Sequence, residues 1–350
     1  ADCAAQDYFL SGESTNKGIL LDKGWRFHAG DDPEWASTEY DDKDWKSINP
    51  TLDIHALPEI PRSGIGWFRL HLSVDSNSVI DPLALLIQQS GASEIYLDGA
   101  LIHRFGILST DPLKVRAYDP LKKPALLSLT RKSHQVLAIR YALQTNASYT
   151  TIFETRNPAL LVIIRNLTPS IENEKKQTSI TLAMQVFTIG FCFMLFTLHL
   201  AFYIFYPAQK ANLYFSLFAF FFLTSCLARI FFFLYSHTVN AKFYFANISL
   251  DLIPIGYFFL LTAIYFLFDQ KRGKLYWSLM ALIVIAFVFT AYAYGWGWLI
   301  GGPLMQLLVV LNVTYIAMLS LRRNKRGSWI MVAGSIICLI FFVGFILQRK

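Results

Sequence analysis

The chain has 350 residues, of which 54% are hydrophobic and 16% are charged. This composition is too apolar for a soluble protein and the chain is too long for one membrane bundle, so two domains are expected. The formal net charge of +7 comes largely from short connections between apolar segments, and we therefore expect no nucleic-acid partner.

Residues 1–17 come before the first periodic pattern. They contain Asp, Glu, Gly, Ser and Asn without a period, and we expect a loose lead-in. Cys3 lies in this segment, whereas the other three cysteines, Cys192, Cys226 and Cys338, fall inside apolar segments. This arrangement predicts neither a disulfide framework nor a metal site, and no cofactor is expected.

Residues 18–165 consist of short runs typical of β-strands, divided by turn residues. Trp67–Val74 alternates between apolar and polar residues, which predicts a half-buried strand, and Gln135–Leu143 alternates in the same way. Asp98 and Gly99 join two further β-prone arms, a strong signal for a hairpin. About seven or eight strands of this kind predict a β-sandwich.

An acidic and aromatic segment, residues 30–50, follows the first of these runs; we call it the acidic segment. Its Asp and Pro content predicts an ordered loop rather than a strand. Trp35 is our candidate for stacking on a ligand ring, with Asp31 and Asp32 as neighbouring ligand contacts, whereas Trp45 and Trp67 are expected to pack the sandwich. The carboxylates could bind calcium, but their spacing matches no defined calcium loop, so solvated or turn-capping carboxylates are expected.

Residues 166–178, NLTPSIENEKKQT, are polar and contain one proline. We expect a short tether between the sandwich and the first apolar run. A dozen residues allow little independent movement, so a change in the sandwich could reach that run directly.

Residues 179–347 contain six apolar runs in series. Each is long enough, at about 1.5 Å per helical residue, to cross a hydrocarbon core of roughly 30 Å. The runs are Ser179–Tyr206, Leu213–Tyr235, Phe243–Phe268, Leu275–Tyr294, Trp298–Ser320 and Ser328–Leu347. They predict an all-α polytopic membrane domain with six visible spans.

The first, third and fifth connections between these runs carry most of the positive charge. Their basic residues are Lys210 in the first, Lys271, Arg272 and Lys274 in the third, and Arg322, Arg323, Lys325 and Arg326 in the fifth. Because short basic loops stay on the cytoplasmic side, everything before Ser179 is predicted to lie outside. We therefore expect a multi-pass protein with an extracytoplasmic amino-terminal domain that follows a removed signal.

Two charged residues, Arg229 and Asp251, lie inside the second and third predicted spans. Both should lie at a similar depth, roughly 9 and 12 Å below the same interface. Charges are costly there, and neighbouring antiparallel spans could hold them as a pair. Such a pair would act either as a packing clamp, or as a conformational switch or ion path.

Five stretches of the sequence resemble one known domain. They are GWRFHAGDD, DDKDW, GIGWFRLHLSV, SEIYLDGALIHRFG and QVLAIRYAL. In order and spacing they resemble the galactose-binding-like jelly roll that serves as the sugar-binding domain of family two glycoside hydrolases, over about residues 18–145. A jelly roll before a membrane bundle resembles the bacterial seven-transmembrane receptors with diverse intracellular signalling modules, over most of residues 18–347.

The resemblance implies a receptor of the bacterial inner membrane, with an outer domain for a small ligand, plausibly a carbohydrate, and a cytoplasmic output module. The chain departs from that pattern because it stops at Lys350 after six spans and before an output module. We therefore expect a receptor truncated before its seventh span, with the saccharide and membrane lipids as partners and a homodimer left open.

The alternative function is a transporter or channel component with an outer domain that captures solute, although the sequence has neither an internal repeat nor more than one intramembrane charge pair. Enzymatic activity is not expected, because the sequence has no Gly-rich phosphate loop and no nucleophile elbow, and leaves no room for a catalytic barrel.

Overall fold

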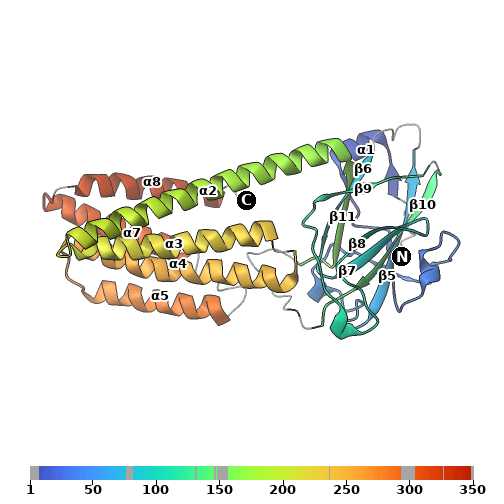
Figure 1. The fold of residues 1–350 in the computed structure, drawn as a ribbon, viewed down its shortest axis with the longest axis horizontal. Helices are drawn as coiled ribbons and strands as arrows, with labels where there is room; N and C mark the ends of the chain where they lie inside the picture. Colours follow the sequence, from blue (N-terminus) through green and yellow to red (C-terminus); the bar gives the residue numbers. More distant parts are fainter. Residues whose placement is uncertain are drawn as a thin grey trace. The chain divides into compact units, whose positions relative to one another are not determined.

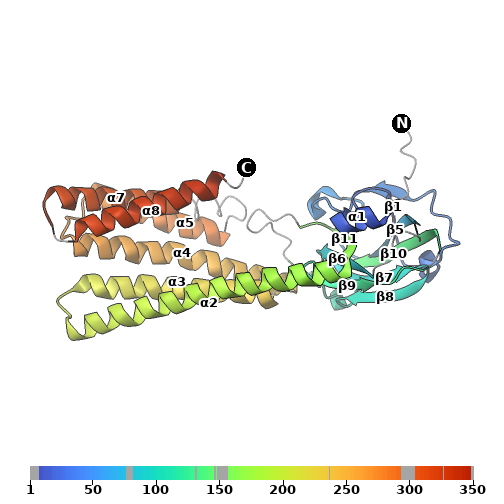
Figure 2. The same ribbon diagram turned by 90° about the horizontal axis from the view of Figure 1, so that it is seen from above.

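The computed structural model describes residues 8–75, 82–130, 132–145, 147, 157–235, 237–292, 304–325 and 327–347. The chain forms two compact units (Figures 1 and 2). Ala1–Thr151, Thr155–Thr181 and Tyr235–Phe243 belong to the first, which we call the sandwich unit. Leu182–Leu234 and Tyr244–Lys350 make up most of the second, the helical unit.

The larger sheet of the sandwich unit has seven strands in the order β4-β3-β5-β10-β7-β8, with β1 pairing β5 outside this path. Its members are β1 (Tyr8–Leu10), β3 (Trp25–Ala29), β4 (Lys46–Ile48), β5 (Ile65–Val74), β7 (Ala92–Leu97), β8 (Ala100–Phe105) and β10 (His134–Ala142). All pairs along the path are antiparallel, whereas β1 runs parallel to β5.

The smaller sheet has four antiparallel strands in the order β2-β11-β6-β9. They are β2 (Ile19–Leu20), β6 (Leu83–Gln89), β9 (Pro124–Leu127) and β11 (Leu160–Asn166). Apolar side chains of the two sheets form one buried core that includes Phe68, Leu70, Leu85, Leu137 and Ile164. Alternate residues of the strands supply this core, so the β-sandwich that the sequence predicts is confirmed.

The alternating stretches and the hairpin turn that the sequence predicts are present in the structure. The alternating stretches are β5 and β10, and the hairpin turn between β7 and β8 lies at Asp98 and Gly99. Both turn residues have positive φ, 50° and 82°, as a two-residue hairpin turn requires. The expectation that β5 is only half buried is wrong, because the side chains of Trp67 and Arg69 on its outer side are 1% and 0% exposed.

The acidic segment causes this burial by packing over the outer side of the larger sheet. It contains the short 3-10 helix η1 (Pro33–Ala36) and strand β4. Its Ala36 and Trp45 join Trp67 in a second buried cluster. Further 3-10 turns are η2 (Ile54–Ala56) and η3 (Pro112–Lys114).

Residues 8–17, which the sequence predicts as part of a loose lead-in, are ordered. Tyr8–Leu10 forms β1, which pairs with β5, and Leu10 is fully buried. Helix α1 (Gly12–Lys17) follows, and its first turn is held by a reciprocal capping box between Ser11 and Ser14. One buried leucine and a helix cap thus order a stretch that has no period of its own.

Six long apolar helices follow the sandwich strands in the described residues. They are α2 (Leu167–Phe205), α3 (Lys210–Tyr235), α4 (Val239–Leu267), α5 (Lys274–Tyr292), α7 (Met305–Arg322) and α8 (Ser328–Leu347). Four of them, α2, α3, α4 and α7, are long and apolar enough to cross a membrane. These four helices indicate a multi-pass membrane protein.

The structure therefore supports four candidate spans rather than the six that the sequence predicts. The fully described parts of α5 and α8, Lys274–Val288 and Ser328–Ile340, are apolar helices, and these parts are shorter than the roughly 18 to 20 residues that a span needs. The start of the predicted fifth span, residues 298–303, lies outside the described residues.

The predicted tether is helical, because Leu167–Phe205 is one continuous helix of 39 residues that starts directly after β11. Its first turns contain Glu, Lys and Gln, which favour helix, and Pro169 lies near the helix start, where a missing N–H costs little. At about 1.5 Å per residue, the helix is about 58 Å long, well beyond a membrane's hydrocarbon thickness.

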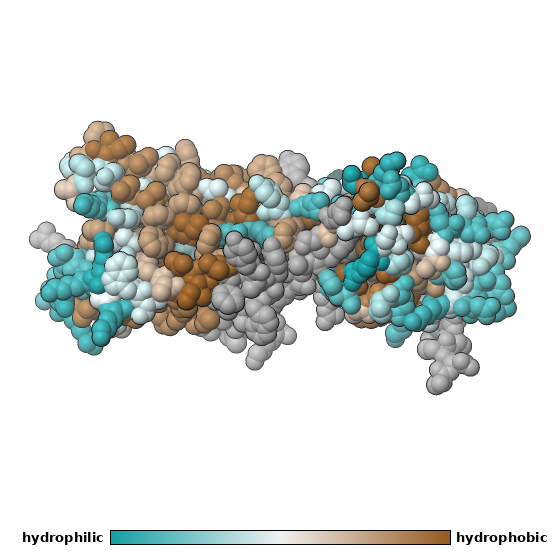
Figure 3. Space-filling model, turned by 90° about the horizontal axis from the view of Figure 1, so that it is seen from below, coloured by the Kyte–Doolittle hydropathy of each residue, from teal (hydrophilic) through white to brown (hydrophobic). Residues whose placement is uncertain are grey.

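The core of the helical unit is formed by α4, α5 and α7. Among its buried residues are Leu261, Tyr276, Ile283, Val309 and Ile316. Only 6% of the most apolar stretch of α2 is buried, and α2 exposes large side chains such as Phe187 and Phe193. Figure 3 shows hydrophobic side chains over much of this unit's surface, as expected of helices that face lipid.

Candidate functional site

A buried arginine fixes the acidic segment to the larger sheet. Arg69 of β5 donates from Nε to Oδ2 of Asp42 at 2.8 Å. Its Nη1 donates to the carbonyl oxygens of Trp35 and Ser37, and its Nη2 donates to that of Tyr40. A fully buried guanidinium is tolerable only when its donors are satisfied in this way, so Arg69 serves the fold.

Asp42 is the acidic partner in this cluster, with a side chain that is 4% exposed. Besides Arg69, the Nη1 of Arg26 lies 2.7 Å from Oδ1 and the Nε2 of His71 lies 3.0 Å from Oδ2. Burial alone would raise the pKa of Asp42, but the hydrogen bonds and charges of His71 and Arg69 hold it well below its usual value. The carboxylate is therefore ionised at neutral pH and anchors the segment.

Trp35 and Asp32, two of the predicted ligand contacts, make contacts within the fold. The ring of Trp35 is partly buried, and its centroid lies 4.8 Å from that of His28 and 5.2 Å from that of Trp45. Asp32 caps η1, because its Oδ1 accepts from the backbone N–H of Glu34 at 2.9 Å. Trp45 and Trp67 are buried as the sequence predicts.

Asp31 belongs to a chain of charges on the outer side of the larger sheet. Its two carboxylate oxygens accept from Nε and Nη2 of Arg140 at 2.7 and 2.6 Å. The Nη1 of Arg140 donates to Glu94 at 3.0 Å, and the Nε of Arg104 lies 3.1 Å from the same carboxylate. Tyr96 donates its hydroxyl to Glu94 at 3.0 Å. We call these five residues the charged band.

The pKa of Asp31 is lowered chiefly by its hydrogen bond from Arg140, so this end of the charged band is ionised at neutral pH. The side chain of Arg104 is 67% exposed, whereas those of Asp31, Arg140 and Glu94 are 26%, 20% and 16% exposed. The sequence identifies Asp31 as a site residue but misses Arg140, Glu94 and Arg104. Their only signal is their place on β-strands that the sequence predicts.

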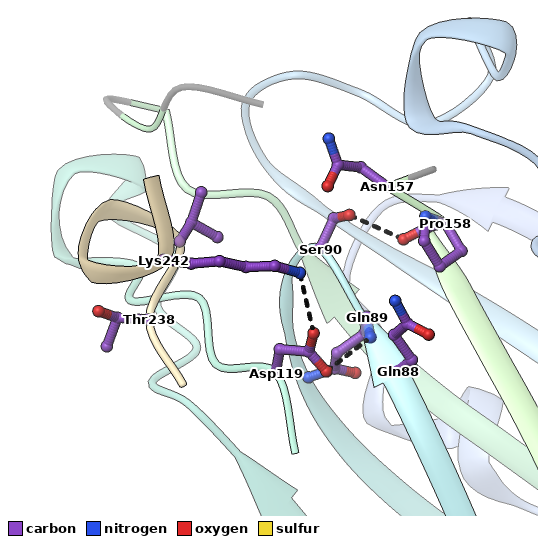
Figure 4. A pocket seen from close by; sticks show the side chains of 9 residues that line it. Gln88, Gln89, Ser90, Asp119, Asn157, Pro158, Thr238 and Lys242 are labelled. Atoms are coloured by element: carbon purple, nitrogen blue, oxygen red, sulfur yellow. Dashed lines mark hydrogen bonds and ion pairs between the residues drawn. The ribbon is translucent and has the colours of Figure 1, made fainter. Parts of the chain in front are cut away.

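A second polar site is a small pocket of the sandwich unit (Figure 4). Its walls come from the end of β6 at Gln88–Ser90, from Asp119, from Asn157 and Pro158, and from residues 238–242, all of which belong to this unit. The cavity volume is about 20 Å³, which leaves room for about one water molecule.

The pocket encloses an ion pair. The Nζ of Lys242 lies 3.6 Å from Oδ2 of Asp119, and the two side chains are 19% and 6% exposed. The other oxygen of Asp119 accepts from the backbone N–H groups of Leu121 at 2.9 Å and Gln89 at 3.4 Å. Burial raises the pKa of Asp119 even though Lys242 lies close by.

Backbone and ring contacts extend this site to His237. The N–H of Asp119 donates to the carbonyl of His237 at 2.7 Å, and the rings of Tyr118 and His237 stack at 5.0 Å with an angle of 13°. Thr238 then caps α4, because its hydroxyl accepts from the N–H of Ala241 at 3.3 Å. The residues that begin α4 are thus held by the turn after Tyr118, within the sandwich unit.

The sequence predicts that Arg229 and Asp251 pair across two helices, and this contact stays a prediction. Arg229 is exposed on α3, and Asp251 is half-buried on α4, one turn before Pro254. Their functional coupling stays a prediction. Among the described residues, no group of three or more His, Cys, Asp or Glu side chains is placed to hold a metal ion.

No family model and no curated protein matches the chain. Solved structures do match. A glycosyl hydrolase family 2 member from Bacteroides cellulosilyticus is 18% identical over 43% of this chain and 21% of its own, with a TM-score of 0.28. Beta-glucuronidase 2 of Bacteroides uniformis is 15% identical over 42% of this chain and 18% of its own, with a TM-score of 0.31.

A third match, the beta-glucuronidase of Bifidobacterium dentium, is 13% identical over 46% of this chain and 32% of its own, with a TM-score of 0.28. The chain thus corresponds to no more than about a third of the length of these three enzymes. This is a distant likeness of the amino-terminal β-sandwich to part of a family 2 glycoside hydrolase. It assigns neither a family, nor a ligand, nor an activity.

Proposed function

We propose that the chain is a membrane receptor whose sandwich unit binds a small ligand and whose helices carry the resulting change across the membrane. The observation that carries this proposal is the buried contact between Asp119 and Lys242. It makes the first residues of α4 a part of the sandwich unit. A ligand that favours one arrangement of that unit would therefore bias the start of a membrane helix.

Helix α2 supplies a second connection. It begins at Leu167, directly after β11 ends at Asn166, and continues without a break into a candidate span. The side chain of Asn166 donates to Asn16 at 2.8 Å, and Ser170 in the first turn donates its hydroxyl to the carbonyl of Asn166 at 2.7 Å. A helix transmits displacement over its length better than a flexible linker of the same residues.

We propose a saccharide as the ligand and the charged band as its binding surface. Carboxylate and guanidinium groups offer acceptors and donors that match sugar hydroxyls, and the ring of Tyr96 lies among them. Arg104 at the exposed end has donors that can reach a ligand, whereas Trp35 is occupied by ring contacts. The jelly-roll resemblance of the sequence points to the same class of ligand.

For the membrane arrangement, we propose that α5 and α8 cross together with the four candidate spans, and that the sandwich unit lies outside the bacterial cytoplasmic membrane. We also propose that this chain catalyses no reaction of its own. In a cysteine-free background, Ser128→Cys should react with an impermeant thiol reagent on intact cells and Asn324→Cys should not. The reverse labelling would contradict the orientation.

The test of function uses the full chain in detergent. A glycan array should yield at least one bound saccharide, and Arg104→Ala should weaken its binding by about tenfold, the worth of one charge-assisted hydrogen bond. Lys114→Ala removes a cation of similar exposure, 75% against 67% for Arg104, away from the charged band and should leave binding unchanged. Hydrogen exchange should then report whether the ligand alters residues 237–243.

Two outcomes would refute the receptor. One is an array without any binding. The other is a bound saccharide that leaves hydrogen exchange at residues 237–243 unchanged, because the ligand would then not reach α4. Binding that is equal in the Arg104→Ala and Lys114→Ala variants would refute the charged band as the ligand surface.

A further inference from the structure

Two connections of the helical unit carry a concentration of positive charge. They are residues 268–273 between α4 and α5, and residues 323–327 between α7 and α8, which lie at the same end of the unit in Figures 1 and 2. With the first residue of α5 and the last residue of α7 they supply Lys271, Arg272, Lys274, Arg322, Arg323 and Lys325. We call these six residues the basic face. Asp269 is the acidic residue among the described residues of these two connections.

The two connections are tied together. The Nζ of Lys325 donates to the carbonyl of Phe268 at 2.5 Å, and Gln270 reaches the hydroxyl of Ser320 at 3.5 Å. The retention of positive charge on one side of a membrane requires no such fixed geometry. The contacts instead bring basic residues from separate parts of the chain onto one surface.

Arg272 is held in place on this surface. Its guanidinium lies 4.4 Å from the ring centroid of Phe266 and 5.7 Å from that of Tyr276. Ring contacts of this kind leave the N–H edge of the guanidinium available to an anion. Among the described residues, no ion pair neutralises the basic face, and five of its six members are exposed while Lys325 is half-buried.

Exposed tryptophans lie next to the basic face. Trp277 of α5 and Trp329 of α8 are 61% and 64% exposed, and each lies in the first turn of a helix that follows a basic connection. Figure 3 shows hydrophilic side chains gathered at the left end of the helical unit, beyond its hydrophobic surface. Tryptophan prefers the headgroup level of a bilayer, so this position marks the basic face as interfacial.

We propose that the basic face binds the phosphate headgroup of an anionic phospholipid. Basic residues next to a membrane boundary attract acidic lipids, and a planar guanidinium fixed beside other cations suits a phosphodiester. The adjacent tryptophans favour a lipid over a soluble anion, because they hold the basic face at the depth of the headgroups. This proposal stands on the helical unit alone and does not depend on the ligand of the sandwich.

The test measures lipid binding to the full chain in detergent micelles, with phosphatidylglycerol as the anionic probe and phosphatidylcholine as the neutral comparison. Phosphatidylglycerol should bind about tenfold or more tightly than phosphatidylcholine. Lys271→Gln, Lys274→Gln and Arg323→Gln together should reduce that binding on the order of a hundredfold, because each basic residue near an anionic surface contributes a factor of about five. Raising the salt from about 0.1 M to 1 M should weaken it, since the screening length falls from about 10 Å to 3 Å.

The matched control is Lys122→Gln, Lys175→Gln and Lys176→Gln, which removes the same charge from exposed positions of the sandwich unit. It should bind phosphatidylglycerol as the unmodified chain does. Arg272→Gln alone should weaken binding about fivefold or more, whereas Arg272→Lys should restore only part of it, because lysine lacks the planar fork.

Several outcomes would overturn the lipid site. Equal binding of the two lipids, or full binding by the first triple variant, would show that the basic face does not select an anionic headgroup. Equal losses in the two triple variants would assign the effect to net charge. Competition by inorganic phosphate at the concentration of the lipid would identify a site for free phosphate instead.

Discussion

Replacing Lys242 by methionine should release the start of α4 more than replacing its partner Asp119 by asparagine does. Lys242→Met leaves a carboxylate that is only 6% exposed without its nearest cation. Asp119→Asn keeps an oxygen that can accept from the N–H of Leu121. The freed ammonium group belongs to a side chain that is already 19% exposed, so it can turn towards water. Lys242→Met should therefore lower the stability of this region more than Asp119→Asn does.

The separation of 3.6 Å between Nζ and Oδ2 sets the scale. At an effective dielectric constant of about 20, the attraction of two unit charges at this distance is about 4 to 5 kcal/mol. Desolvation of both groups offsets much of this, in agreement with the raised pKa of Asp119. We expect a cost of about 1 to 3 kcal/mol for Lys242→Met, less than about 1 kcal/mol for Asp119→Asn, and a smaller loss in the double variant than the sum.

Hydrogen exchange of the full chain in detergent measures this locally, because the N–H of Asp119 donates to the carbonyl of His237 at 2.7 Å. Each 1 kcal/mol lost should speed exchange of that N–H about fivefold. Lys122→Met is the control, since Lys122 is an exposed lysine in the adjacent turn and should change little. A larger effect from Asp119→Asn than from Lys242→Met, or strict additivity in the double variant, would refute the reasoning.

The same pair predicts a pH dependence. Since the pKa of Asp119 is raised in the folded chain, this group contributes stability below its unfolded pKa of about 3.9. That contribution is lost as the pH rises through the folded value. In the unmodified chain, the unfolding free energy should therefore decrease as the pH rises above about 4. Asp119→Asn should abolish this decrease. An unchanged pH profile of thermal unfolding in the Asp119→Asn variant would contradict this assignment.

Three further predictions concern the sandwich. Arg69→Met should cost about 3 to 5 kcal/mol of unfolding free energy, because it removes the buried cation that pairs with Asp42 and donates to three backbone carbonyls. Arg104→Met at an exposed position should cost less than about 1 kcal/mol. Similar losses in thermal unfolding would contradict the burial argument. The pKa of Asp42 is lowered in the folded chain, so this carboxylate stabilises the fold at pH values above its unfolded pKa of about 3.9. That stabilisation is lost as the pH falls through the folded pKa. Asp42→Asn should therefore reduce the loss of unfolding free energy at acidic pH. Gly106→Ala should destabilise more than Gly64→Ala, because both have positive φ but only the new Cβ at Gly106 would lie 2.3 Å from a backbone oxygen; equal shifts in melting temperature would show that the contact relaxes without cost.

The sequence by itself determined the features that depend on neighbours along the chain. Alternation with a period of two located β5 and β10, because successive side chains of a strand point to opposite faces. Asp98 and Gly99 specified the hairpin turn, since few other residues adopt positive φ easily. Long apolar runs identified the membrane helices, because a lipid core accepts little else.

Two segments took a structure that their local sequence did not indicate. Residues 166–178 are polar, which suggested a tether, although they include good helix formers. They are helical because α2 continues from them into the apolar stretch that follows. Tyr8–Leu10 has no period, and only its pairing with β5 makes it a strand. Segments this short take their structure from their partners.

The sequence named Asp31 as a site residue, but the partners that surround each candidate site were decided by tertiary structure. The burial of Arg69 follows from the acidic segment folding over β5, which no periodicity of β5 can reveal. Asp119 and Lys242 meet although more than a hundred residues separate them along the chain. Isolated charges carry no local signal of their partners, because an ion pair depends on distance in space and on burial rather than on spacing in sequence.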